Sequence, residues 1–197
     1  MDTLRIAKAI KFATVAHDKS FRKGSKIPYI AHPAEVAMLL STLTDDDDVI
    51  IAGLLHDVVE DTQVSLEEIE KEFGERVAKL VEYESEDKME HIPKSESWKT
   101  RKKTALDHLK NSPRDAKLIC LCDKLSNMRE SAESFDKYGD DMWRAFNQKD
   151  KKEQEWYYRS IGEILSEFKN TDIWIEYMKI CDKVFGKNQK EVGKTEL

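Results

Sequence analysis

Residues 48–62 read Asp-Val-Ile-Ile-Ala-Gly-Leu-Leu-His-Asp-Val-Val-Glu-Asp-Thr, and this stretch decides the class of fold. No polar side chain occurs between residues 49 and 55. A helix that is apolar on all sides leaves no face for water, so it lies inside the protein. The pattern predicts a buried helix over residues 48–59, with His56 and Asp57 directly after its apolar run. The other elements of the fold are then expected to pack around it.

The remainder of the chain is also typical of helices. It contains only 7 glycines and 4 prolines, while charged residues make up 37% of the sequence. Apolar residues at helical spacing, and end signals such as the capping box Ser65-Leu66-Glu67-Glu68, predict further helices. We expect them over residues 4–17, 33–43, 75–84, 98–111, 114–130, 140–147, 150–169 and 172–185, with a short helix after the capping box. No segment has the pattern of a strand, so the prediction is an all-α helical bundle.

The length of 197 residues favours a single domain. A domain of this size buries about 70% of the surface that its unfolded chain exposes, so it needs no disulfides to form a core. We expect residues 1–186 to form the domain and residues 187–197 to be a polar, frayed tail.

Composition and charge exclude several classes of partner. The net charge of -6 and the pI of about 5.5 are unlike the basic surface of a nucleic-acid binder. No apolar run approaches the roughly 20 residues that span a bilayer, and no signal peptide is apparent. The three cysteines are too few for a disulfide framework and indicate a reducing compartment. We therefore expect a cytoplasmic protein that binds neither nucleic acid nor membranes.

Two carboxylates interrupt apolar runs, and this pattern points to chemistry. Asp57 follows the buried helix, and Asp123 lies within the apolar segment 118–125. A buried, unpaired carboxylate costs several kcal/mol, so each aspartate must be paired, protonated or bound to a metal. One cation between them would serve both, with His56 and His32 as two further ligands. Such a set suits Mn²⁺, Zn²⁺, Fe²⁺ or Mg²⁺ and leaves coordination positions open for water and substrate.

Glu60 and Asp61 follow the His56-Asp57 pair by four residues each. If the helix continues through this stretch, both carboxylates share the face that carries the ligands. They could then orient the attacking water, or take its proton and pass it to the leaving group. The alternative is that they are solvated residues at the end of a helix.

Other polar side chains could contact a ligand. Asn127 follows Asp123 by four residues, so it could bind a ligand or hold Asp123 in place. Arg22 and Lys23 lie in a basic loop, where a flat guanidinium suits the face of a base and a lysine suits a polyanion. The alternative for both is an ordinary basic surface loop.

Several segments resemble a known family, the hydrolase domain of RelA/SpoT homologues. They match it in order and approximate spacing over about residues 5–130, and the block from Leu54 to Thr62 is the most specific. With no synthetase region attached, the chain looks like a small alarmone hydrolase with an HD domain, of the metazoan SpoT-homologue type. The matching segments are Ala31-His32-Pro33, Leu54–Thr62, Cys122–Met128, Phe21-Arg22-Lys23, Pro28-Tyr29-Ile30 and Phe73-Gly74 with Val77.

The resemblance implies a Mn²⁺-dependent 3′-pyrophosphohydrolase that converts (p)ppGpp to GDP or GTP and pyrophosphate. It implies that Glu60 and Asp61 position and activate the attacking water. Arg22 would stack on the guanine with Lys23 beside it, and Asn127 would contact the ribose or its phosphates. The implied metal ligands are His32, His56, Asp57 and Asp123.

Two further nucleotide contacts follow from the resemblance to the metazoan-type hydrolases. Lys88 would reach a phosphate, and Tyr157 would line the nucleotide pocket, with core packing as the alternative for Tyr157. Residues 84–103 and the C-terminal third depart from the pattern of the long RelA/SpoT proteins, so the nucleotide pocket could differ from theirs.

Three alternatives to alarmone hydrolysis stay open at this point. The chain could be a phosphatase that acts on another nucleotide or on a nicotinamide dinucleotide phosphate. It could be a module that binds an alarmone without cleaving it, although such a module has no need for the Glu60-Asp61 pair. The metal site could also be purely structural. The sequence leaves the native metal and the oligomeric state open.

Overall fold

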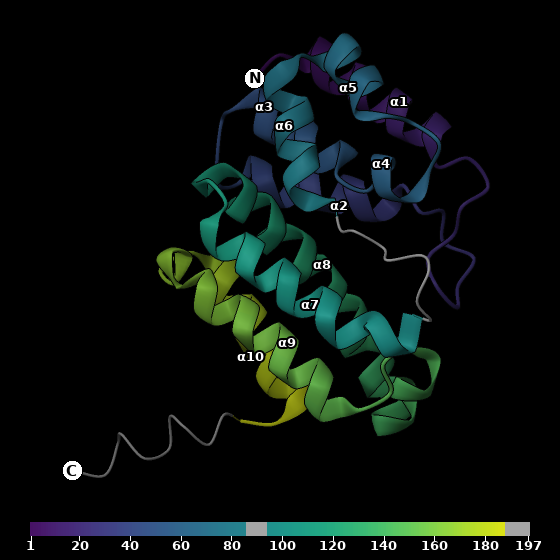
Figure 1. Ribbon diagram of the computed structural model, residues 1–197, viewed down its shortest axis with the longest axis vertical. Helices are drawn as coiled ribbons and strands as arrows, with labels where there is room; N and C mark the ends of the chain where they lie inside the picture. Colours follow the sequence, from purple (N-terminus) through teal and green to yellow (C-terminus); the bar gives the residue numbers. More distant parts are fainter. Residues whose placement is uncertain (86–93, 188–197) are drawn as a thin grey trace. The chain divides into compact units, whose positions relative to one another are not determined.

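The computed structural model describes residues 1–85 and 94–187, and these residues form helices joined by short loops (Figure 1). Within these two ranges no strand occurs, only an isolated bridge between Phe21 and Pro28, so the all-α prediction is confirmed. The elements are α1 (Thr3–Ala16), α2 (Ala31–Ser41), α3 (Asp47–Leu55), α4 (Val58–Asp61), α5 (Leu66–Phe73), α6 (Glu75–Glu84), α7 (Lys94–Asn111), α8 (Arg114–Tyr138), the 3-10 segment η1 (Gly139–Ala145), α9 (Lys151–Ile164), the 3-10 segment η2 (Ser166–Phe168) and α10 (Asp172–Phe185).

The chain divides into two compact units. Of the described residues, the first unit comprises 1–85 and 108–126, and the second comprises 94–107 and 127–187. Helices α7 and α8 each contribute residues to both units. The single domain expected over residues 1–186 stays a prediction. The polar tail expected over residues 187–197 lies, after residue 187, outside the described residues.

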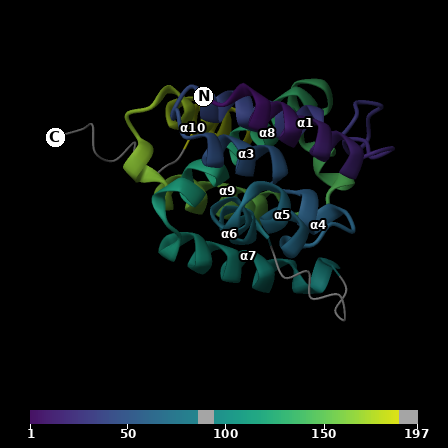
Figure 2. The same cartoon turned by 90° about the horizontal axis from the view of Figure 1, so that it is seen from above.

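Helix α3 is the centre of the first unit. All of its residues from Val49 to Leu55 are buried, and it packs against α1, α2 and α6. Figures 1 and 2 both show it beside α1 and α6. A Cβ atom at Gly53 would lie 2.2 Å from Leu40 Cδ1, so a glycine is needed for α2 to approach this closely. The apolar helix that precedes His56 is therefore buried at the centre of this unit.

The prediction of one helix over residues 48–59 is wrong. Helix α3 ends at Leu55 and α4 begins at Val58, with His56 and Asp57 between them. Both residues keep backbone dihedrals in the right-handed helical region. At this interruption His56 Nε2 lies 3.1 Å from Asp57 Oδ2.

Other helix boundaries also differ from the predictions. Helix α8 continues to Tyr138 instead of ending at residue 130, and Gly139 stops it with a positive φ of 55°. The helix predicted over residues 150–169 ends at Ile164 and is followed by η2. The capping box expected at Ser65 is present at the start of α5.

One arginine joins three elements of the first unit. Arg76 on α6 donates hydrogen bonds to Asp46 at the start of α3 and to Asp115 near the start of α8, at 2.8 and 2.9 Å. Because its side chain is 46% exposed, these ion pairs add little to the free energy of unfolding. They do fix the starts of the two helices that lead to Asp57 and Asp123.

The second unit has a core of its own. Helices α9 and α10 pack together, and Tyr177 is fully buried between apolar residues of this unit. Trp174 Nε1 donates to the carbonyl oxygen of Gly162 at 3.0 Å, which joins the two helices. Across both units the three cysteines are free and buried. No helix in the described ranges is long and apolar enough to cross a membrane.

Candidate active site

Four side chains from three parts of the first unit converge on one point. His32 lies in the first turn of α2, His56 and Asp57 lie between α3 and α4, and Asp123 lies on α8. His32 Nε2 is 3.0 Å from Asp123 Oδ1, and His56 Nε2 is 3.1 Å from Asp57 Oδ2. The two crossed distances, from His32 to Asp57 and from His56 to Asp123, are both 3.6 Å. The structure thus brings together the four residues that the sequence suggested as metal ligands.

The hydrogen bonds behind the imidazoles decide which ring nitrogens face the centre as acceptors. His56 Nδ1 lies 2.9 Å from the carbonyl oxygen of Gly53, which can only accept, so Nδ1 carries the hydrogen. Ser126 Oγ donates to Glu35 Oε2 at 2.6 Å, so it accepts from His32 Nδ1 at 2.9 Å. In the neutral state both Nε2 atoms therefore present lone pairs to carboxylate oxygens.

This donor set fits a divalent cation. Two imidazole lone pairs and two carboxylate oxygens face one another, and His56 Nε2 is buried with no hydrogen-bond partner among the described residues. Four acceptors in one buried place repel each other unless positive charge lies between them. The ligand atoms of His32, His56 and Asp57 all lie within 4.8 Å of one another, so this group could hold a metal ion.

The electrostatics of the site favour positive charge at its centre. Burial lowers the pKa of His56, but Asp57 and Asp123 outweigh this effect and raise its pKa well above the usual value. Burial raises the pKa of Asp57, but His56 and His32 outweigh it and lower that pKa. The cluster therefore attracts a proton or a cation, and the carboxylates stay ionised.

Lys124 and Tyr29 each hold one of the two aspartates. Lys124 Nζ donates to Asp123 Oδ2 at 2.5 Å, which leaves Oδ1 facing the imidazoles, and it helps to keep the pKa of Asp123 well below its usual range against the effect of burial. The Tyr29 hydroxyl donates to Asp57 Oδ2 at 2.7 Å. Burial and the charge of Asp57 raise the pKa of Tyr29, so the phenol keeps its hydrogen.

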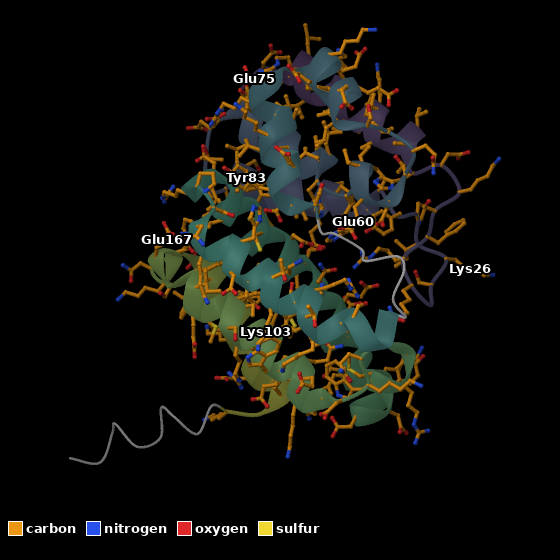
Figure 3. All side chains as sticks on the ribbon, in the orientation of Figure 1. Lys26, Glu60, Glu75, Tyr83, Lys103 and Glu167 are labelled. Carbon is orange, nitrogen blue, oxygen red and sulfur yellow. The ribbon has the colours of Figure 1, made fainter. Side chains whose placement is uncertain are left out.

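Glu60 and Asp61 lie on α4, directly after the ligand pair (Figure 3). The backbone N–H of Asp61 donates to the carbonyl oxygen of Asp57 at 2.9 Å, so Asp61 is still one helical turn beyond Asp57. Glu60 is half-buried and Asp61 is exposed. Asp61 also lines a pocket of about 470 Å³ with Ala16, Thr62, Gln63, Val64 and Glu68.

The basic loop between α1 and α2 folds back on itself. The backbone N–H of Arg22 donates to the carbonyl oxygen of Ile27 at 2.9 Å, and Lys26 at the loop end points away from the helices (Figure 3). The guanidinium of Arg22 lies 5.4 Å from the centre of the Tyr29 ring, while Lys23 is exposed. Tyr29 therefore contacts both Arg22 and the ligand Asp57.

Comparison with known proteins assigns this geometry to a family. A family model described as "HD domain" matches residues 9–154. The guanosine-3′,5′-bis(diphosphate) 3′-pyrophosphohydrolase MESH1 of Xenopus tropicalis is 42% identical over 132 residues, which are 66% of this chain and 70% of that protein. The chain belongs to the MESH1 family of HD-domain proteins.

Other members of the MESH1 family agree with this assignment. The MESH1 protein of Homo sapiens is 38% identical over 132 residues, which again cover 66% of this chain and 70% of that protein. A solved structure, described as a metazoan orthologue of SpoT that hydrolyses ppGpp and plays a role in starvation responses, superimposes with a TM-score of 0.71 at 28% identity. The superposition covers 89% of this chain and 93% of that one. The resemblance to HD-domain hydrolases of RelA/SpoT type is confirmed.

Two predicted nucleotide contacts of this MESH1-family chain are not part of the cluster described above, and a third cannot be placed. Asn127 on α8 and Tyr157 on α9 belong to the second unit, and Lys88 lies outside the described residues. Tyr157 is 7% exposed, and its ring packs 5.9 Å from that of Trp98. Tyr157 is therefore a core residue of that unit. All three nucleotide contacts stay predictions.

Sequence reasoning missed residues that support the ligands in this HD domain. Ser126 lies three residues after Asp123, and Glu35 lies three residues after His32. That spacing places Ser126 on the helix face of Asp123 and Glu35 on the helix face of His32. The spacing could therefore have indicated that both residues lie near the ligands. Tyr29 is distant from Asp57 in sequence, and no spacing rule connects them.

A further carboxyl group of the HD domain lies near the ligands. Glu84 ends α6, and burial raises its pKa to about 8, with Asp123 acting in the same direction and Lys124 opposing both. At neutral pH this side chain is therefore mostly protonated. No sequence pattern indicated this burial, because Glu84 precedes a run of polar residues.

Proposed function

We propose that this chain is a metal-dependent guanosine-3′,5′-bis(diphosphate) 3′-pyrophosphohydrolase, which converts (p)ppGpp to GDP or GTP and pyrophosphate. One observation carries the proposal. Two buried imidazoles, with their Nε2 lone pairs fixed by hydrogen bonds to Gly53 and Ser126, face the carboxylates of Asp57 and Asp123. This centre occurs in a chain that belongs to the MESH1 family.

In this proposal His32, His56, Asp57 and Asp123 bind one divalent cation. Manganese is the metal that the resemblance to RelA/SpoT hydrolases implies, and other divalent cations with a preference for nitrogen and oxygen ligands also suit the set. When bound, the cation supplies positive charge for the phosphoryl oxygens and makes water more acidic. Lys124 and Tyr29 keep the two aspartates ionised and oriented toward it.

Glu60 and Asp61 orient the attacking water in this proposal. As the water oxygen bonds to phosphorus, one of these carboxylates accepts the proton. The bond between phosphorus and the 3′ oxygen of the ribose breaks, and the proton then moves to that oxygen. The proximity of both residues to Asp57 along α4 supports this role.

The nucleotide is held by side chains on both sides of the scissile bond. Arg22 stacks on the guanine, with Lys23 beside it on the same loop. The half-buried position of Arg22 supports this, because its guanidinium already lies over the ring of Tyr29. The further proposed contacts are Asn127 with the ribose or its phosphates, Lys88 with a phosphate, and Tyr157 as part of the pocket lining.

The test measures product formation by the purified chain. After treatment with a chelator and addition of Mn²⁺, ppGpp should yield GDP and pyrophosphate in equal amounts. No product should form without metal or with Asp123→Asn. The chain should cleave ppGpp faster than GTP, other nucleotides and a nicotinamide dinucleotide phosphate.

Two outcomes would contradict the proposal. Tight binding of ppGpp with no product under Mn²⁺ would indicate a binding module instead of an enzyme. Faster turnover of another nucleotide or of the dinucleotide phosphate would assign a different substrate to the same metal centre.

A further inference from the structure

His17 is a buried histidine whose polar atoms have no use in the fold. It directly follows α1 and is 4% exposed, and neither of its ring nitrogens has a hydrogen-bond partner among the described residues. A neutral imidazole has one donor and one acceptor, and leaving either unpaired when buried destabilises the folded state. A phenylalanine would fill a similar space without this loss. Stability alone therefore does not explain a histidine here.

The surroundings of His17 belong to the candidate active site. Its ring lies against that of Tyr29, with centroids 4.7 Å apart and planes inclined by 34°. Tyr29 is the residue whose hydroxyl donates to Asp57 Oδ2, the oxygen that lies beside His56 Nε2. His17 therefore contacts the residue that holds a ligand.

The charged and titratable groups that face His17 are also members of the site. Burial lowers the pKa of His17, the carboxylates of Asp57 and Asp61 oppose this effect, and His56 and His32 reinforce it. Because its pKa is lowered, the imidazole is neutral at pH 7 and keeps one N–H to donate.

A pocket that could hold water lies at the end of α1. Ala16, which precedes His17, and Asp61 both line this pocket of about 470 Å³. A buried water needs room and two or more polar partners, which a ring nitrogen and a carboxylate together provide. Such a water would restrict the orientation of Asp61, the carboxylate proposed to receive the proton.

We propose that His17 is a positioning residue for the hydrolytic reaction. Its ring face fixes Tyr29 against Asp57, and a ring nitrogen holds a water that also binds Asp61. His17 is not a metal ligand in this proposal, since the ligand atoms that converge are those of His32, His56, Asp57 and Asp123. The inference rests on the proposed function, because it assigns the group that orients Asp61 in that reaction.

The two contacts of His17 can be separated by two substitutions. His17→Phe keeps a ring against Tyr29 but removes both nitrogens, so the dissociation constant for Mn²⁺ should stay within about twofold while kcat falls about tenfold or more at nearly constant KM. His17→Ala also removes the ring, so it should weaken Mn²⁺ binding about tenfold, as Tyr29→Phe should. The midpoint of thermal unfolding should not fall in His17→Phe, because no paired polar atom is lost within the protein.

His108→Phe is the matched control. His108 also stacks on a tyrosine, Tyr83, with centroids 5.5 Å apart and planes inclined by 23°, but it has no place in the proposed reaction. This variant should leave Mn²⁺ binding and kcat unchanged. Calorimetric titration with Mn²⁺, thermal unfolding and turnover of ppGpp are measured for every variant.

The outcomes are distinguishable from those that test the function. Full kcat in His17→Phe would overturn the role of the nitrogens, and wild-type Mn²⁺ affinity in His17→Ala would overturn the role of the ring. If both the midpoint of thermal unfolding and kcat fall in His17→Phe, His17 serves packing instead. If the wild-type chain binds Mn²⁺ but does not turn over ppGpp, the proposed function fails, and the role of His17 toward Asp61 fails with it.

Discussion

Ser126→Ala removes one hydroxyl that joins a metal-ligand candidate to a carboxylate. Its Oγ accepts from His32 Nδ1 at 2.9 Å and donates to Glu35 Oε2 at 2.6 Å, and the residue is 3% exposed. Alanine would leave the N–H of His32 without a partner where water has little access. An unpaired buried group of this kind costs about 1–3 kcal/mol. The imidazole would also lose the contact that directs its Nε2 lone pair toward Asp123.

The magnitude follows from this geometry. Loss of the hydrogen bond behind a metal-binding histidine lowers metal affinity about 10- to 100-fold, or about 1.4–2.7 kcal/mol. The assay is calorimetric titration of the chelator-treated chain with Mn²⁺, followed by the Mn²⁺ dependence of ppGpp turnover. Both curves should shift to higher Mn²⁺ concentration by the same factor. The rate at saturating metal should fall by a smaller factor than the Mn²⁺ affinity.

Ser131→Ala is the control for this experiment. Ser131 lies on the same helix and is 7% exposed, but its Oγ donates to the carbonyl oxygen of Asn127 at 3.0 Å within that helix. Its removal should leave Mn²⁺ affinity unchanged. A Ser126→Ala variant that binds Mn²⁺ within about twofold of the wild type would refute the assignment of this hydroxyl to the orientation of His32.

Four further substitutions test other parts of the site. Asp123→Asn should abolish Mn²⁺ binding and activity together, and calorimetry that finds wild-type affinity would exclude Asp123 as a ligand. Glu60→Gln should keep Mn²⁺ affinity and lower kcat about 100-fold or more, as loss of a general base does. If this variant and Asp61→Asn both keep nearly the full rate, neither carboxylate activates the water. Burial raises the pKa of Glu84 from 4.5 to about 8, so the folded protein binds a proton that the unfolded chain releases, and the free energy of unfolding should fall as pH rises from about 4.5 to 8. Glu84→Gln should reduce this fall in urea unfolding of the chelator-treated chain, and an unchanged pH dependence would contradict the raised pKa.

The sequence by itself determined the helical class and the set of ligand candidates. An apolar run from residue 49 to residue 55 must be buried, and an aspartate directly after such a run needs a cationic partner whatever the details of packing. The same argument applied to Asp123. These inferences depend on local pattern and on the free energy of burying charge, and neither requires knowledge of which helices are neighbours.

The tertiary structure decided how the candidates meet and what holds them. The break between α3 and α4, at His56 and Asp57, contradicted the continuous helix that the periodicity predicted. Periodicity describes the faces of one helix, and it does not show where packing against other elements interrupts that helix. The contacts of Tyr29 with Asp57 and of Ser126 with His32 join segments that lie 28 and 94 residues apart. Such contacts arise only when the chain folds, because no rule of sequence spacing operates over those separations.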